Sequence, residues 1–316
     1  MTRGMMLSGV LAMGMAAAGC GGDAPPDDTR TQAMSAEHAA FEAEQQRWRR
    51  QRVETLTLPD GWTSLIGLHW LDPGPHYLGS DADNGIVLGA GPAHLGMIEL
   101  RAGTLRFVPE AGQALTLDGE PLAGSVTLRA DDEAAGPSVI GFDEGKGLIT
   151  VLKRGDRHAL RVKHADAATR TRFKGLDYWP ADPGWRIEGR FVAHPPGTTL
   201  PIGNIIGTLD ETPNPGVVEF EKDGQPFRLE ALDEGDGRLF LVFADLTSGH
   251  ESYGAGRFVY ADAPTPEGRV VVDFNRAYNP PCVFTPFATC PLPPLENRLE
   301  LAVTAGEKKY DPNVSR

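Results

Sequence analysis

The chain has 316 residues and a formal net charge of −13, with 41% hydrophobic and 23% charged residues. This acidic balance argues against sequence-independent binding of DNA or RNA, because such binding needs a positive surface that displaces counterions. The hydrophobic content is sufficient for a folded globule, the length favours two domains, and the 38 Gly and 26 Pro residues favour short strands over long helices.

The first residues are typical of an exported protein. Arg3 precedes an uncharged, largely apolar run that is shorter than the ~20 apolar residues of a membrane span. The run leads into Ala17-Ala18-Gly19-Cys20, which resembles a bacterial lipobox, where the Cys is acylated and becomes the mature N-terminus. We therefore predict a lipoprotein signal peptide over residues 1–19 and a lipid anchor on Cys20, with an ordinary signal peptide as the alternative.

The residues after Cys20 predict where the protein resides. Gly21 follows the Cys, and by resemblance to the sorting rule of Gram-negative lipoproteins it predicts an outer-membrane lipoprotein that faces the periplasm. Residues 20–35 include Pro25 and Pro26 and have no apolar period, so we expect a disordered tether. The membrane, reached through the lipid, is the first predicted partner.

Residues 36–56 form the one segment with a helical pattern. It is rich in Ala, Glu, Gln and Arg and contains neither Gly nor Pro. Phe41 and Trp48 lie seven residues apart and mark one apolar side. We predict a helix over this range.

Residues 57–168 predict an all-β module. Short apolar runs alternate with turn signals, and Asp118-Gly119 lies between two of them, which indicates a hairpin. The pattern around Leu78-Gly79, Asn84 to Leu88 and His94 resembles a forkhead-associated domain.

That resemblance implies a β-sandwich. In the family an Arg follows the Gly and a Ser lies a few residues before the His, and both help to bind phosphothreonine. Here Ser80 and Gly91-Pro92-Ala93 stand at those places, and small neutral groups cannot make charge-assisted bonds to a phosphate. The resemblance is therefore informative for the fold rather than for the function.

Residues 169–310 predict a second β module. Eight short strand patterns separated by Gly and Pro suit an antiparallel sandwich or barrel, with a hairpin at Asp223-Gly224 and a last strand over Arg298 to Thr304. The predicted fold is thus mainly β, with two antiparallel sandwich or barrel modules preceded by one N-terminal helix.

Two cysteines remain once Cys20 is assigned to the lipid. In an exported chain Cys282 and Cys290 suggest one disulfide that closes a small loop. Two free thiols, a metal pair and a reactive thiol are the alternatives.

Polar and aromatic side chains are dense in residues 245–257 and 273–287, each of which follows a predicted strand. Arg257 and Arg276 could bind a carboxylate or a phosphate through two parallel hydrogen bonds. The predicted ligand-binding residues are Thr247, Ser248, Tyr253, Arg257, Asn275, Arg276, Tyr278 and Asn279.

The same two segments contain the candidate catalytic residues. Asp245, Glu251 and Asp273 could act as acid or base or bind a divalent ion, and Ser248 or Cys282 could be a nucleophile with His250 as its base. No spacing of metal ligands or nucleotide-binding fingerprint is present, so we predict neither a metal nor a cofactor.

Each of these residues also has a structural interpretation. Asp245 and Asp273 could cap turns after their strands, and Arg257 with Asp273 could form a structural ion pair.

Long sequence strings identify a family resemblance. Thr247-Ser248-Gly249, Tyr253 to Arg257 and Asp273 to Cys290 resemble the bacterial family called domain of unknown function 1684, over about residues 41–308. The family implies no established activity.

The sequence therefore predicts a lipid-anchored periplasmic protein that binds a small anionic or polar ligand in its C-terminal module. The alternatives are an envelope hydrolase that uses the acidic residues, and a protein-interaction module whose partner the sequence does not identify.

Overall fold

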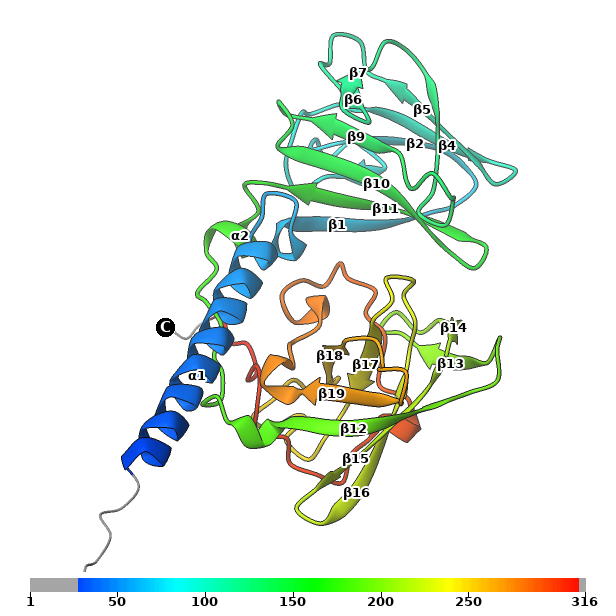
Figure 1. The fold of residues 1–316 in the computed structure, drawn as a ribbon. Coiled ribbons are helices and arrows are strands. Elements are labelled where there is room, and N and C mark those ends of the chain that lie inside the picture. The colour runs from blue at the N-terminus through cyan, green and yellow to red at the C-terminus, as the bar shows by residue number, and fades with distance from the viewer. Residues whose placement is uncertain (1–27, 313–316) are drawn as a thin grey trace, which may run out of the picture. The chain divides into compact units, whose positions relative to one another are not determined.

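The computed structural model describes residues 28–312 (Figure 1). The predicted signal peptide, the lipid anchor at Cys20 and most of the predicted tether lie outside these residues. The described residues from 41 onward belong to one compact unit, and the contacts given below lie within it. Among the described residues no helix is long and apolar enough to cross a membrane.

Helix α1 spans Asp28–Leu56, so it begins at Asp28 rather than at the predicted Ala36. The extension is consistent with the sequence, since neither Gly nor Pro occurs between Pro26 and Leu56. Within the compact unit its inner face carries Phe41 and Gln45, which are both buried, and Leu56 at its end. Because this face is partly polar, specific hydrogen bonds rather than an apolar stripe attach the helix.

Two β-sheets follow α1 and enclose one core. A six-stranded sheet has the order β1-β11-β10-β9-β6-β7, and a five-stranded sheet has the order β3-β2-β4-β5-β8. Buried side chains from both sheets, among them Ile98 and Phe107 from one and Ile140 and Phe142 from the other, form a single apolar cluster. This is the sandwich arrangement that the sequence predicted.

The strand bounds of this sandwich are as follows: β1 Leu65–Leu71, β2 Gly74–Gly79, β3 Ile86–Val87, β4 Gly96–Arg101, β5 Thr104–Pro109, β6 Thr116–Leu117, β7 Glu120–Pro121, β8 Val126–Leu128, β9 Val139–Phe142, β10 Gly147–Arg154 and β11 Arg157–His164. The β6–β7 hairpin turns at Asp118 and Gly119, both with positive φ (52° and 90°), which confirms the predicted turn. Ser80 donates a hydrogen bond to the carbonyl of Gly91 (2.8 Å), so these loop residues bind each other.

Strand β11 places basic side chains on the sheet face that is turned away from the core. Leu160 and Val162 belong to the core cluster, so the alternating residues Arg157, Arg161 and Lys163 lie on the opposite face. Arg154 of β10 is directly opposite Arg157 in the pairing register and shares that face. Four cations thus lie on the outer face of this sheet.

A short helix, α2 (Ala168–Thr171), leads to the C-terminal sheets. A four-stranded sheet has the order β16-β15-β12-β19, and the hairpins β13-β14 and β17-β18 form two-stranded sheets. All of these pairings are antiparallel, as predicted. The strands are β12 Arg186–Ala193, β13 Thr199–Gly203, β14 Leu209–Pro213, β15 Gly216–Lys222, β16 Gln225–Ala231, β17 Leu239–Phe243, β18 Arg257–Ala261 and β19 Arg269–Asp273.

The last predicted strand, Arg298 to Thr304, is wrong. One isolated bridge joins Arg298 to Ala244, and no regular strand follows in the structure as described. The reason is that the carbonyls of Val303 and Ala305 bind the side chain of Arg257 instead of a neighbouring strand. The C-terminal segment is thus attached first by backbone hydrogen bonds, from the N–H of Leu299 to Ala244 (2.8 Å) and from the N–H of Leu246 to Leu301 (3.0 Å), and then by the side chain of Arg257.

Gly306 is required where this segment passes close to the turn after β19. Its φ is +80°, and a Cβ there would lie 2.4 Å from the Ala277 carbonyl oxygen and 2.8 Å from that of Phe274. Neither backbone group can move without disturbing buried neighbours. Only glycine fits this position.

We therefore expect Gly306→Ala to lower the free energy of unfolding by roughly 2 kcal/mol or more, through left-handed strain plus a backbone clash. Gly224→Ala is the matched control: its φ is +74°, but nothing lies within 4 Å of the added Cβ. Urea unfolding of both variants measures the difference. Equal losses of stability would show that backbone strain alone matters at Gly306.

Candidate functional site

The predicted ligand-binding residue Arg257 is a buried structural anchor. Its side chain is 1% exposed, and its Nη2 donates to Asp245 Oδ2 (2.6 Å) and to the Val303 carbonyl (2.8 Å). Nη1 donates to the Ala305 carbonyl (2.5 Å). Burial lowers the pKa of Arg257, while the charge of Asp245 opposes that effect. No free face of this guanidinium remains for a ligand.

In the first polar loop, residues 245–257, the polar side chains around Asp245 form hydrogen bonds with one another. Oδ1 of Asp245 accepts hydrogen bonds from the backbone N–H (2.9 Å) and the hydroxyl (2.6 Å) of Thr247, and its own N–H donates to Ser248 Oγ (3.1 Å). Thr247 and Ser252 share a buried hydroxyl–hydroxyl bond (2.8 Å). Asp245 is thus a turn cap and an ion-pair partner, whereas Glu251 is exposed on the surface.

Asp273 pairs with Arg186 and not with Arg257. Its Oδ2 accepts hydrogen bonds from Arg186 (2.9 and 3.0 Å) and from Gln45 of α1 (2.8 Å), and Oδ1 accepts one from the Asn275 N–H (3.1 Å). The sequence-based pairing of Arg257 with Asp273 is therefore wrong. These bonds attach α1 to the end of β19.

Arg276 extends the same network. It forms an ion pair with Glu44 of α1 and lies 3.4 Å from Asp273. The hydrogen bond and the charge of Arg186 lower the pKa of Glu44. Asn275 also donates to the Asp182 carbonyl (2.9 Å), so the second polar loop, like the first, is held by internal contacts.

Glu307 is a fully buried carboxylate that the sequence analysis did not identify. It accepts hydrogen bonds from Arg52 Nε of α1 (2.9 Å) and from the Asn279 N–H (2.7 Å). The charge of Glu307 raises the pKa of Arg52 despite its burial. Asn279 is held by these contacts and by its own bond to the Lys308 carbonyl (2.8 Å).

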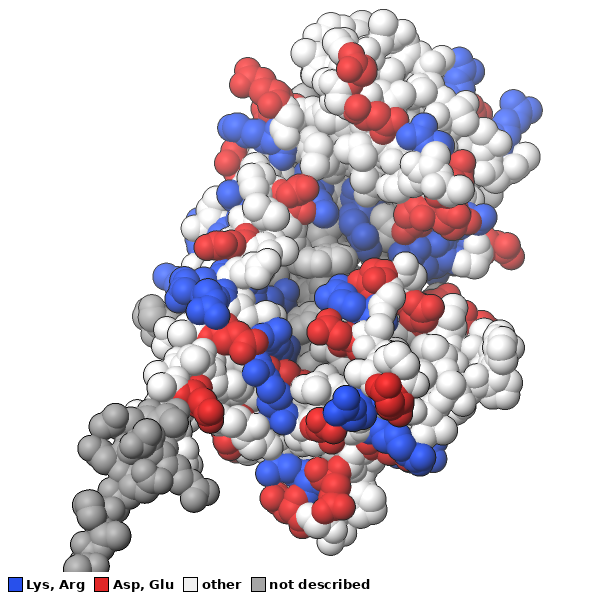
Figure 2. All heavy atoms as spheres, in the orientation of Figure 1, with Lys and Arg blue, Asp and Glu red and all other residues white. Residues whose placement is uncertain are grey.

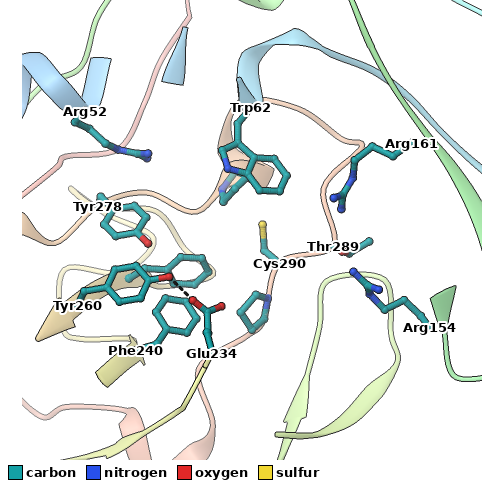
Figure 3. A pocket seen from close by; sticks show the side chains of 13 residues that line it. Arg52, Trp62, Arg154, Arg161, Glu234, Phe240, Tyr260, Tyr278, Thr289 and Cys290 are labelled. Atoms are coloured by element: carbon teal, nitrogen blue, oxygen red, sulfur yellow. Dashed lines mark hydrogen bonds between the residues drawn. The ribbon is translucent and has the colours of Figure 1, made fainter. Parts of the chain in front are cut away.

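A cavity of about 340 Å³ lies beside this anchor (Figure 3). Its volume is within the range of small-molecule sites. Of the predicted ligand-binding residues only Tyr278 lines it. Three arginines, one carboxylate and several aromatic rings form its walls: Arg52, Trp62, Arg154, Arg161, Glu234, Phe240, Phe258, Tyr260, Tyr278, Pro281, Thr289, Cys290 and Pro291.

Stacked rings make one wall of the cavity. Phe240 stacks on Tyr260 with ring centroids 4.9 Å apart, and Tyr260 stacks on Tyr278 at 6.3 Å. The Tyr260 hydroxyl is hydrogen-bonded to Glu234. Burial, followed by the charges of neighbouring groups, raises the pKa of Tyr260, so this residue stays a neutral donor. The wall suits a flat apolar group.

The three arginines of the cavity differ in what neutralises them. Arg52 has Glu307, and Arg154 has Asp131 (2.9 Å). Arg161 forms no ion pair with any described residue, and its buried Nε has no hydrogen-bond partner. Its guanidinium lies over Trp62, 5.3 Å from the ring centroid. Burial lowers the pKa of Arg161, and the charge of Arg154 acts in the same direction.

Figure 3 shows how these groups are arranged. The guanidinium groups of Arg154 and Arg161 lie on one side of the cavity and the Tyr260–Glu234 pair on the other, with Trp62 and the sulfur of Cys290 between them. Figure 2 shows Lys and Arg side chains inside the hollow in the middle of this face, whereas both charges mix elsewhere. The cavity is thus locally basic in an acidic protein.

Sequence reasoning missed Trp62, Arg154, Arg161 and Glu234. The alternation of Arg157, Arg161 and Lys163 along β11 was a usable signal, because it places three cations on one face. The candidate acids Asp245, Glu251 and Asp273 do not line the cavity. No group of three or more metal-ligating side chains occurs among the described residues.

Part of the chain matches the model of a known protein family. Residues 171–308 match the family described as "Protein of unknown function (DUF1684)". The chain belongs to the DUF1684 family. This segment contains the aromatic wall, Glu234 and both remaining cysteines, whereas Trp62, Arg154 and Arg161 precede it.

A solved structure shares part of this sequence. The solution NMR structure of an uncharacterized protein from Haloarcula marismortui is 33% identical, with 44% of this chain and 78% of that protein covered and a TM-score of 0.37. No curated protein matches the chain.

The two remaining cysteines lie next to each other. Cys282 and Cys290 are free thiols in the structure, and the N–H of Cys282 donates to the sulfur of Cys290 (3.1 Å). The structure does not show the predicted disulfide, which stays a prediction.

We expect Arg257→Met to lower the free energy of unfolding by about 3–5 kcal/mol, because it leaves the carboxylate of Asp245 buried without its counterion. Arg190→Met is the control, since the Arg190–Glu219 pair is exposed (71% and 43%) and its loss should change stability by less than ~0.5 kcal/mol. Urea unfolding measures both. A stable Arg257→Met protein would return this residue to the list of ligand-binding candidates.

Proposed function

We propose that the protein binds a small anionic molecule with a flat apolar portion in the cavity lined by Arg161. The single observation that carries this proposal is the guanidinium of Arg161, which lines an aromatic cavity without a paired carboxylate. A partly buried cation without a counterion is costly, so an anion that enters the cavity would gain a strong charge-assisted hydrogen bond.

The residues that line the cavity indicate which class of ligand it would bind. Arginine presents a planar fork that matches a carboxylate or a phosphate group. The stacked rings of Phe240, Tyr260 and Tyr278 favour an aromatic or similarly flat body. Glu234, across the cavity from Arg161, would repel the anionic end of the ligand and accept a hydrogen bond from a donor at its other end.

The geometry favours binding over hydrolysis. Asp245 and Asp273 are committed to buried or partly buried ion pairs with Arg257 and Arg186, and neither lines the cavity. We therefore retain the small-ligand hypothesis and transfer its site from the two polar loops to the Arg161 cavity.

We expect phenyl phosphate and benzoate to bind at this cavity, and Arg161→Met to weaken that binding about tenfold or more, since a hydrogen bond to a charged group contributes ~1.5–3 kcal/mol. Titration followed by the NMR signal of the Trp62 indole measures affinity. Arg157→Met is the control, because this arginine of the same strand stacks on Trp70 (4.1 Å) and does not line the cavity.

Benzyl alcohol has the aromatic ring but no negative charge. It should therefore bind the wild-type protein no better than it binds the Arg161→Met variant. If phenyl phosphate and benzoate bind equally to wild type, Arg157→Met and Arg161→Met, or do not perturb Trp62, the proposed site is wrong.

We also propose that the protein is a lipoprotein attached to a membrane through Cys20, with its folded part in the periplasm. The lipobox-like residues before Cys20 support this proposal. In a Gram-negative host we expect the full chain to partition into the detergent phase of Triton X-114 and the Cys20→Ser variant to remain in the aqueous phase. Equal partitioning of the two would refute acylation at this residue.

A further inference from the structure

Cys282 and Cys290 form a pair in which one thiol is accessible and the other is buried. Cys282 lies in a short 3-10 helix, Pro281–Val283, and is partly exposed, whereas Cys290 is 4% exposed and lines the cavity. The N–H of Cys282 donates to Cys290 Sγ (3.1 Å), so the two residues lie side by side although eight positions separate them.

Hydrogen bonds make the two thiols chemically different. Cys290 and the hydroxyl of Tyr253 both donate to the sulfur of Cys282, and these bonds lower the pKa of Cys282. The same bond to Cys282 raises the pKa of Cys290, while the nearby charge of Arg161 opposes that increase. Cys282 is thus the thiol that an external disulfide can reach, and the buried thiol of Cys290 lies beside a cation.

This combination is the one that thiol–disulfide exchange needs. The attacking sulfur must be a thiolate that an external disulfide can reach, and a second thiol must be close enough to displace the mixed disulfide. A structural disulfide would need neither an accessible sulfur nor a hydrogen-bond donor such as Tyr253. A metal site would need further ligands, and the described residues offer no such cluster.

We propose that Cys282 and Cys290 form a reversible thiol–disulfide site that reacts with low-molecular-weight disulfides. In the first step the Cys282 thiolate attacks a disulfide, one S–S bond breaks and another forms, and one small thiolate leaves. In the second step Cys290 loses its proton and attacks the Cys282 sulfur, which releases the second small thiolate. The protein loses two electrons and two protons, and the small disulfide becomes two thiols.

Tyr253 has a positioning role in this site. Its hydroxyl touches the sulfur of Cys282 and not the incoming disulfide, so it acts by stabilising the thiolate. This role is independent of ligand binding in the Arg161 cavity, because Tyr253 and Cys282 are not among the residues that line it.

The test uses the full chain with Cys20→Ser, so that only the two cysteines react, and glutathione disulfide as the probe. Intact-mass spectrometry should show a product lighter by two hydrogens, which dithiothreitol restores to the dithiol. Adding Cys290→Ser should trap one glutathionyl group on Cys282. Adding Cys282→Ser should slow the reaction at least tenfold, because Cys290 is buried.

A pH series separates the role of Tyr253 from simple packing. With Tyr253→Phe we expect the half-maximal reaction rate at a higher pH than in the parent protein, since the thiolate loses a hydrogen bond. Tyr77→Phe is the control, because Tyr77 is 61% exposed and distant in sequence from both cysteines. Near-ultraviolet circular dichroism confirms that each variant is folded.

Three results would overturn the proposal. The first is a native protein that does not react, although the urea-unfolded chain does. The second is equal reactivity of the Cys282→Ser and Cys290→Ser variants. The third is a disulfide that dithiothreitol reduces only after unfolding. None of these results depends on whether phenyl phosphate or benzoate binds at Arg161.

Discussion

The buried carboxylate of Glu307 is the constraint on which the cavity depends. A charge with no exposed surface costs several kcal/mol unless partners surround it, and Glu307 receives its partners from two distant segments. Arg52 comes from α1 and the N–H comes from Asn279. Each of these partners also positions a cavity wall, because Arg52 lines the cavity itself and Tyr278 precedes Asn279. The tail of the chain thus sets the geometry of a site formed by other elements.

The same physical requirement explains why the most polar loops are not the candidate site. Arg257 satisfies the carbonyls of Val303 and Ala305, and Asp245 neutralises that arginine. Asp273 similarly binds Arg186 and Gln45, which attaches α1. Buried N–H and C=O groups of irregular backbone need hydrogen-bond partners, and polar side chains after strands supply them. A dense group of polar residues in such a place therefore indicates a structural role as readily as a ligand site.

Local features were predictable from the sequence, whereas the site was not. The turn at Asp118 and Gly119 follows from residues that tolerate positive φ, and the mainly β fold follows from short alternating runs. Alternation also places Arg157 and Arg161 on one strand face. It cannot show that Arg161 lines the same cavity as Tyr260 and Glu234, because these residues are far apart in sequence. Only tertiary packing reveals which cation lacks a carboxylate.

The net charge and the cavity act on different classes of anion. A formal charge of −13 creates a field that opposes the approach of a long polyanion, whose many phosphates must lie along the surface. A small anion experiences mainly the nearest charges once it has entered, since salt screens surface charges over about 10 Å. In the cavity those charges are Glu234 and three arginines, two of which have their own carboxylates. The acidic net charge is therefore compatible with the proposal that one small anion binds at Arg161.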